Sequence, residues 1–235
     1  MRLNEIDIIR GIAIVLMVVF HIVFDLTNFF GFNIEYHRGF WYYEGRLSAI
    51  LFIMAAGMVS AVIAGQGDLK TAWQKNLKRG LRLIGWGMVI TLVTWFFDSK
   101  NTIWFGILHF LGVAIILSIL FARFRWVNLI LGILIIILGS FFLKLQADHS
   151  WFLIFGIRPY GFQSWDYYSL FPWFGVVLIG LGLGNFVYQN QTMLPATKKP
   201  SHVVFSSLIW LGKYSLWIYL VHQPILLGLF WLFLK

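Results

Sequence analysis

The sequence predicts an all-α, polytopic membrane protein, built as a bundle of about seven helices that cross the bilayer. Its 235 residues are 60% hydrophobic and only 11% charged, which leaves too few polar side chains to cover a soluble globule of this length. The apolar runs are long and continuous rather than alternating, which argues against an outer-membrane barrel. Composition and run length therefore indicate the same class.

Seven apolar runs approach the length of about 20 residues that a helix needs to cross the hydrocarbon core. They fall at residues 8–29, 46–64, 81–97, 103–122, 126–145, 169–188 and 214–234. Between them, the basic stretch 65–80 is predicted to be a short amphipathic connector on the membrane surface. Residues 147–168 are predicted to form an ordered interfacial loop. No internal repeat is found, and we expect a single domain over residues 1–235.

The lysines and arginines predict how the chain is oriented. With the N-terminus inside, 12 of the 18 cations fall on the cytoplasmic side, which agrees with the positive-inside rule. The other six are Arg38, Arg46, Lys100, Lys144, Arg158 and Lys235. We therefore expect an N-in, C-out protein of the inner (plasma) membrane. Topology and anionic membrane lipids then explain the net charge of +9 without a nucleic-acid partner.

The first span is unusual because it carries ionisable side chains, which are costly inside a membrane and mark functional sites there. At its start, Asn4 is predicted to cap the helix, and Asp7 and Arg10 have the spacing of an ion pair. Deeper in the span, His21 lies roughly 20 Å beyond Ile8. Asp25, one turn further on, would orient the His21 imidazole as a base. The alternative is that His21 and Asp25 only satisfy each other.

These residues resemble the opening of the transmembrane acyltransferases, through the string Glu5-x-Asp7-x-x-Arg10-Gly11-x-Ala13 with a histidine eleven positions after the arginine. The chain is most similar to a small bacterial member of the heparan-α-glucosaminide N-acetyltransferase catalytic-domain family. A looser likeness extends to the membrane acyltransferases that O-acetylate surface polysaccharides. Further matching segments are Gly45-Arg46, Leu51 to Gly57, Phe105 to Gly112, Phe171 to Gly175 and Leu216 to Ile225.

The resemblance implies transfer of an acetyl group from cytosolic acetyl-CoA to a sugar amine or hydroxyl across the membrane. His21 falls where the polysaccharide acyltransferases have their histidine, whereas the lysosomal enzyme has an asparagine there. That enzyme's proposed catalytic histidine lies after the first span, where this chain has His37 at a longer spacing. We therefore expect His21 to be the base and His37 to be the second candidate. Direct transfer and an acetyl-histidine intermediate both remain open.

Other residues are candidates for supporting roles, each with a plainer alternative. His109 is predicted near the depth of His21, or else as a packing histidine. His222, two residues before the helix-bending Pro224, would line the donor route. CoA phosphates would meet cations, namely Arg10, Lys78, Arg79 and Arg82. The acceptor would meet Arg46, Trp41 and Asp166, which otherwise serve as interface anchors.

Several mechanisms are disfavoured by what the sequence lacks. The chain has no cysteine, and its six histidines show no metal-binding spacing, so no metal is expected. The expected partners are membrane lipids and a carbohydrate or glycolipid acceptor, and pairing into a homodimer is left open. Two rival functions stay open as well. One is a small proton-coupled transporter with His21, Asp25, His109 and His222 as a relay, and the other is a non-catalytic membrane subunit.

Overall fold

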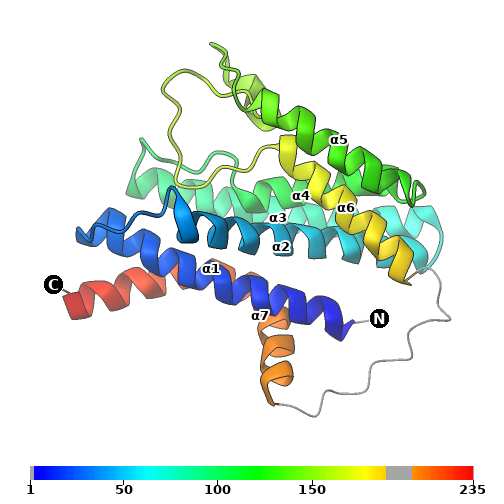
Figure 1. Ribbon diagram of the computed structural model, residues 1–235, viewed down its shortest axis with the longest axis horizontal. Helices are drawn as coiled ribbons and strands as arrows, with labels where there is room; N and C mark the ends of the chain where they lie inside the picture. The colour runs from blue at the N-terminus through cyan, green and yellow to red at the C-terminus, as the bar shows by residue number, and fades with distance from the viewer. Residues whose placement is uncertain (1–2, 189–202, 235) are drawn as a thin grey trace. The chain divides into compact units, whose positions relative to one another are not determined.

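The computed structural model describes residues 3–188 and 203–234 (Figure 1). Within these ranges the chain is all-α, which confirms the predicted class. Its elements are α1 (Asn4–Phe30), α2 (Gly39–Gly65), α3 (Leu69–Phe97), α4 (Ile107–Ser118), η1 (Ile119–Phe121), α5 (Val127–Phe142), η2 (Ser150–Phe155), α6 (Leu170–Tyr188) and α7 (Val203–Leu234). The two η segments are short 3₁₀ helices.

Five of the helices in the described ranges are long and apolar enough to cross a membrane, namely α1, α2, α3, α6 and α7. The prediction of a membrane protein is thereby confirmed. The apolar helices Ile107–Phe121 and Val127–Phe142 are shorter, so the count of seven spans and the N-in, C-out orientation stay predictions.

Two of the predicted boundaries are wrong. The basic stretch 65–80 is not a separate connector, because α3 begins at Leu69 and continues without a break to Phe97. Its Leu, Lys, Gln and Arg residues favour helix strongly, so the amphipathic stretch forms the first turns of a longer helix. At the other end of the chain, α7 begins at Val203 rather than near residue 214.

The chain divides into two compact units, which are described separately below. The first comprises Met1–Ala55 and Leu194–Lys235, and the second comprises Ala56–Met193. In the described residues, the first unit contains α1, the outer part of α2 and α7, and the second contains the rest of α2 with α3 to α6. A single domain over residues 1–235 therefore stays a prediction.

In the first unit, α1 and α7 pack with their backbones almost in contact (Figure 1). A Cβ added at Gly11 would lie 2.1 Å from the Leu208 carbonyl oxygen, and one added at Gly212 would lie 1.8 Å from that of Asp7. Any side chain at either position would clash with backbone. Glycine is therefore required at this crossing, as is common where membrane helices pack closely.

In the second unit, two further helix pairs cross through facing glycines. Gly80 of α3 packs against Gly112 of α4, and Gly132 of α5 packs against Gly175 of α6. In each pair, a Cβ on one glycine would lie 2.4–2.7 Å from the carbonyl oxygen of the other. Because lipid tails give little hydrophobic drive for association, close backbone packing of this kind holds such helices together.

Candidate functional site

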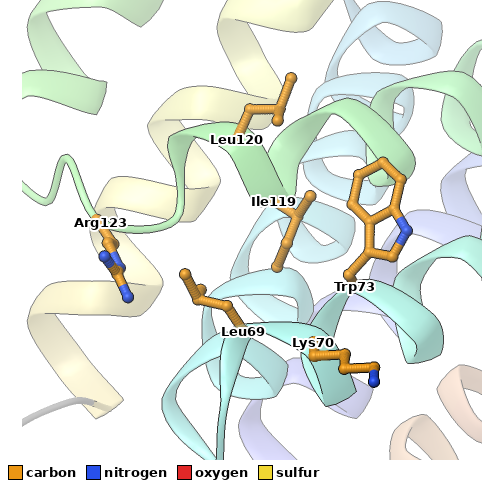
Figure 2. Close-up of a pocket in the computed structure, with 6 residues that line it drawn as sticks. All are labelled: Leu69, Lys70, Trp73, Ile119, Leu120 and Arg123. Carbon is orange, nitrogen blue, oxygen red and sulfur yellow. The ribbon is translucent and has the colours of Figure 1, made fainter.

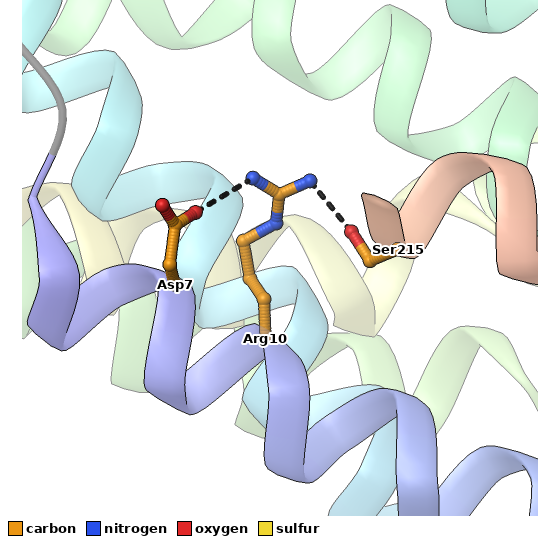
Figure 3. A network of polar contacts seen from close by, with 3 residues as sticks. All are labelled: Asp7, Arg10 and Ser215. Carbon is orange, nitrogen blue, oxygen red and sulfur yellow. Dashed lines mark hydrogen bonds and ion pairs between the residues drawn. The ribbon is translucent and has the colours of Figure 1, made fainter. Parts of the chain in front are cut away.

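Arg10 joins three helices of the first unit (Figure 3). Its guanidinium lies 3.5 Å from Asp7 one turn earlier and donates to Ser215 Oγ of α7 at 2.7 Å. It also lies over the ring of Phe52 in α2, 5.9 Å from the centroid. The predicted pairing of Asp7 with Arg10 is confirmed. The predicted cap is wrong, because Leu3 occupies the cap position and α1 has no side-chain cap.

Two histidines of the first unit face each other, His21 of α1 and His222 of α7. Their ring centroids are 4.6 Å apart and the rings are nearly perpendicular, at 80°. His21 Nδ1 lies 2.8 Å from the Met17 carbonyl oxygen, and His222 Nδ1 lies 2.6 Å from that of Tyr219. A carbonyl only accepts hydrogen bonds, so each Nδ1 carries the proton and each Nε2 is left to accept one. The pair therefore presents two potential bases.

Asp25 lies beside this pair, fully buried, and accepts a hydrogen bond from Gln223 Nε2. The predicted hydrogen bond between Asp25 and His21 is wrong, because no such contact is found in the described residues. Side chains on a helix lean toward its N-terminus, so His21 reaches the carbonyl one turn earlier instead. Asp25 holds α7 next to His222, and a catalytic role for it stays a prediction.

The spacing of Arg10 and His21 places both on one stripe of α1. Eleven residues are close to three helical turns, so the two side chains leave the helix in nearly the same direction. Arg10 contacts both α2 and α7 from this stripe. His21 therefore lies on the side of α1 that faces these two helices.

Glu44 of α2 is a candidate that the sequence reasoning missed. It is 6% exposed, and neither carboxylate oxygen has a hydrogen-bond partner in the described residues. The predicted span started at residue 46, whereas the helix starts at Gly39, so Glu44 fell in a supposed loop. The signal was an acid placed between four aromatic residues, Phe40 to Tyr43, and an apolar run.

His37, the second candidate base, lies between α1 and α2 and is exposed. Its ring packs on Tyr36, with centroids 4.1 Å apart. Tyr36 in turn packs on Phe20 and Phe24, which flank His21 in helical position. The segment thus folds back onto the end of α1 that carries His21. Exposure leaves His37 without the buried surroundings that His21 has.

In the second unit, His109 of α4 is buried and packs over Gly87 of α3. Its Nε2 lies 3.4 Å from Thr91 Oγ1, which itself donates to the Ile103 carbonyl at 2.6 Å. The Thr91 oxygen therefore accepts from Nε2–H, and His109 Nδ1 is left without a partner in the described residues. These contacts fit a packing histidine, and the catalytic role of His109 stays a prediction.

Asp166 of the second unit is a helix anchor. Its Oδ2 accepts a hydrogen bond at 2.8 Å from the backbone N–H of Ile107, the first residue of α4. Burial raises the pKa of the Asp166 carboxyl from 3.8 to about 6, while this hydrogen bond acts in the opposite direction. The geometry explains Asp166 as a cap, and sugar binding by Asp166 stays a prediction.

Two other acceptor candidates lie near the start of α2. Arg46 is exposed, with its guanidinium 4.9 Å from the centre of the Tyr42 ring. Trp41 is half-buried and packs edge-on against Phe40. Both arrangements suit an interface anchor as well as a sugar contact.

Two cations, Lys70 of α3 and Arg123, line a surface pocket of the second unit (Figure 2). The pocket encloses about 420 Å³ and is lined by Leu69, Lys70, Trp73, Ile119, Leu120 and Arg123. Further along α3, Lys78 and Arg82 are exposed, and Arg79 donates to Asn76 at 3.2 Å. The indole of Trp73 and the cations Lys70 and Arg123 in one pocket suit an anionic group attached to a flat ring. The predicted donor contacts Lys78, Arg79 and Arg82 are not among the residues that line the pocket, and the sequence did not predict the pocket.

The described residues contain no group of three or more His, Cys, Asp or Glu side chains that would hold a metal ion.

Comparison with protein families gives one informative result. The family model described as heparan-alpha-glucosaminide N-acetyltransferase, catalytic, matches residues 2–224. Neither the comparison with curated proteins nor the comparison with solved structures gives a match.

Proposed function

Because the chain belongs to the heparan-α-glucosaminide N-acetyltransferase catalytic-domain family, we propose that it transfers an acetyl group from cytosolic acetyl-CoA to a sugar acceptor on the far side of the inner membrane. Family membership makes the protein a membrane acetyltransferase. The donor, the sugar amine or hydroxyl that accepts the acetyl group, and the inner membrane are parts of the proposal. The observation that supports it most is the facing pair His21 and His222.

His21 is proposed as the base. Its Nδ1–H is held by the Met17 carbonyl, which fixes the ring and leaves Nε2 to take a proton from the acceptor during attack on the thioester carbon. The same nitrogen would then return that proton to the departing sulfur. A positioned general base of this kind contributes about 10²- to 10⁴-fold to rate. His222, in contact with His21, would support the ring or relay the proton.

The donor is proposed to bind through the cations of the second unit. Lys70 and Arg123 at the pocket, with Lys78 and Arg82 further along α3, offer charge for its phosphates. Trp73 offers an aromatic face for the adenine ring. Arg10, in contrast, already binds Asp7 and Ser215, so its first role is to join helices.

The test is acetyl transfer by the purified protein with labelled acetyl-CoA and a panel of sugars. We expect His21→Ala to lower the rate about 100-fold or more because the base is lost. His37→Ala should stay within about threefold of the wild type. His149→Ala, at an exposed loop histidine, is the matched control. Loss of transfer in His37→Ala alone would move the base to His37.

A transporter is the rival function, because His21 and His222, with the buried acids Asp25 and Glu44 in the same unit, would also suit a proton relay. A proton-coupled transporter would move solute into vesicles without acetyl-CoA. Flux of that kind, with no acetylated sugar formed, would overturn the proposal. The third candidate, a non-catalytic membrane subunit, would require that acetyl transfer appear only when a partner protein is added.

A further inference from the structure

Two buried oxygens lack partners where Asp25 of α1 meets Gln223 of α7. Asp25 is fully buried, and its Oδ1 accepts a hydrogen bond from Gln223 Nε2. Its other oxygen, Oδ2, and Gln223 Oε1 have no hydrogen-bond partner in the described residues. Both atoms are acceptors when Asp25 is ionised, so neither can satisfy the other. An ionised carboxylate left in this state would be costly inside a membrane.

The charged and titratable neighbours of Asp25 do not compensate a negative charge on it. Among the described residues, the ion pairs found are at Arg10 and Arg38, and neither includes Asp25. His21 lies one turn earlier on α1, and His222 of α7 contacts His21. The Nδ1 of each ring is held by a carbonyl of its own helix, so neither Nδ1–H is donated to the acid.

We propose that Asp25 is protonated and forms a two-point hydrogen-bonded pair with Gln223. A carboxylic acid and a primary amide are complementary at their ends. The amide N–H donates to one carboxyl oxygen, and the O–H on the other carboxyl oxygen donates to the amide oxygen. One proton on Asp25 Oδ2 therefore satisfies both of the oxygens that lack partners, and it removes the buried charge without any further side chain.

The pair makes Gln223 a positioning residue for the two histidines. This step rests on the function proposed above, whereas the protonation of Asp25 does not depend on it. Gln223 follows His222 directly in α7, and Asp25 is one turn from His21 in α1. Two parallel hydrogen bonds at this level fix how α7 is rotated against α1. That rotation sets the contact between the two imidazole rings.

A neutral Asp25 also suits His21 as the proposed base. A carboxylate beside an imidazole favours the protonated imidazolium, which cannot accept another proton. A protonated carboxyl group has no such charge, so the Nε2 atoms of His21 and His222 stay available at neutral pH. In this arrangement Asp25 belongs to the contact between two helices and acts on the base through Gln223 and His222.

Infrared spectroscopy of the purified protein in an ester-free detergent tests the protonation of Asp25 without any assay of activity. A protonated carboxyl group has a C=O stretch that is separate from the bands of carboxylates and amides. At about pH 8 we expect one such band that shifts when aspartate is labelled with carbon-13 and disappears in Asp25→Asn. Asp166, whose pKa is about 6, is ionised at that pH and does not contribute.

Asp148→Asn, at an exposed loop acid, is the matched control for the infrared band and should leave it in place. The proposal is wrong if the labelled wild type shows no protonated aspartate at about pH 8. It is equally wrong if the band survives in Asp25→Asn.

The kinetics of acetyl transfer test the positioning role. Asp25→Ala and Gln223→Leu each remove both hydrogen bonds and should lower kcat about 10- to 100-fold, with KM changed by less than about threefold. Asp25→Asn keeps a two-point pair, because its amide N–H donates to Gln223 Oε1 and its oxygen accepts from Gln223 Nε2. It should therefore recover most of the loss in kcat seen with Asp25→Ala.

Gln74→Leu makes the same change as Gln223→Leu at an exposed position of α3 and should leave kcat unchanged. If Asp25→Asn is as slow as Asp25→Ala, the acid acts through its charge and the proposal fails. Where Asp25→Ala does not fold, Gln223→Leu and the infrared band decide. If the wild type transfers no acetyl group to any acceptor, the proposed function fails, and the infrared band still tests the protonation of Asp25.

Discussion

The imidazole of His21 is held by the backbone of its own helix rather than by a neighbouring acid. The hydrogen bond to the Met17 carbonyl requires no second side chain, and it fixes which ring nitrogen carries the proton. His222 uses the same device with the Tyr219 carbonyl. Both rings are thereby oriented from within their helices, and Asp25 is free to bind Gln223 of α7. The site depends on how α1 and α7 meet more than on any local dyad.

Asp166 should make the stability of the protein depend on pH. Burial raises its pKa from 3.8 to about 6, so the folded protein holds a proton there that the unfolded chain has released. Its stabilising contribution is complete below about pH 4 and is lost as the pH rises through about 6. The loss should be on the order of 2 kcal/mol. Thermal unfolding in detergent between pH 4 and pH 7 measures it.

The comparison variant is Asp166→Asn, which still accepts the hydrogen bond from Ile107 but does not titrate. It should lose the fall in stability between pH 4 and pH 7. Asp148→Asn, at an exposed acid of the same loop, should keep the wild-type profile. Equal slopes for the wild type and Asp166→Asn would show that Asp166 is not the titrating group.

Among single residues, the sequence predicted those that differ clearly from their neighbours along the chain. His21 is a histidine inside an apolar run, and in the structure it does lie in the candidate site, in contact with His222. The partner of His21 was not predictable, because His222 comes from a helix about 200 residues later. The predicted hydrogen bond between Asp25 and His21 was wrong, because helical spacing alone does not show which way an imidazole leans. Glu44 was missed because the start of its helix was placed too late.

Helix pairs in both units are held by glycines that admit the backbone of a neighbour. This occurs at Gly11 and Gly212 between α1 and α7, and at two glycine pairs in the second unit. The close packing of α1 on α7 explains why Arg10 in the opening motif is followed by Gly11. Arg10 reaches across to Ser215 only because Gly11 lets the two helices come close. Arg10 and Gly11 therefore act together to join α1 to α7.

Gly212→Ala should destabilise the packing of α7 on α1. The new methyl group would lie 1.8 Å from the Asp7 carbonyl oxygen, and backbone on both sides leaves it no room. We expect a loss of about 3 kcal/mol or more, together with loss of acetyl transfer. Thermal unfolding and the transfer assay measure the two effects.

Gly228→Ala is the matched control, because a Cβ at Gly228 of the same helix meets nothing within 4 Å. Alanine favours helix over glycine by about 1 kcal/mol, so this variant should be neutral or slightly more stable. Equal behaviour of the two variants would mean that the close crossing does not form.

Helix positions followed from the apolar runs, but helix ends did not. Hydropathy locates the part of a helix that is apolar and does not register its polar first turns. For that reason α3 was expected near residue 81 and begins at Leu69, and α7 was expected near residue 214 and begins at Val203. For α5 the error is opposite, because the apolar run 126–145 continues beyond the end of the helix at Phe142.

For the molecule as a whole, the parity of the spans matters more than their number. Five helices in the described residues are long enough to cross, and seven were expected. Both numbers are odd, so either count places the two ends of the chain on opposite sides of the membrane. The excess of lysine and arginine predicts that the N-terminal side is inside.

Tags at the two ends of the chain test this topology in intact cells. A membrane-impermeant label added from outside should reach the C-terminal tag and not the N-terminal tag. Labelling of both tags after the membrane is opened is the control. Labelling of both in intact cells would require an even number of spans, and labelling of the N-terminal tag alone would reverse the orientation.

The class of the molecule and its family could be predicted from the sequence because both depend on features repeated along the chain. The division into two units was not foreseen, because it depends on which helices pack together. That information lies in contacts between distant residues such as Gly11 with Leu208. Without these contacts, the sequence shows only a series of similar apolar spans.

The helical stretch between Arg10 and His21 sets the distance between these two side chains along α1. It measures about 16 Å, more than half of a hydrocarbon core of about 30 Å, with Arg10 at one end and the proposed base His21 at the other. Side chains between these two residues that do not pack against α7 can vary without changing this distance, whereas Gly11 is required at the crossing. A single added or removed residue would change both the depth of His21 and, by about 100°, its direction. In this part of the chain, length is fixed more strictly than composition.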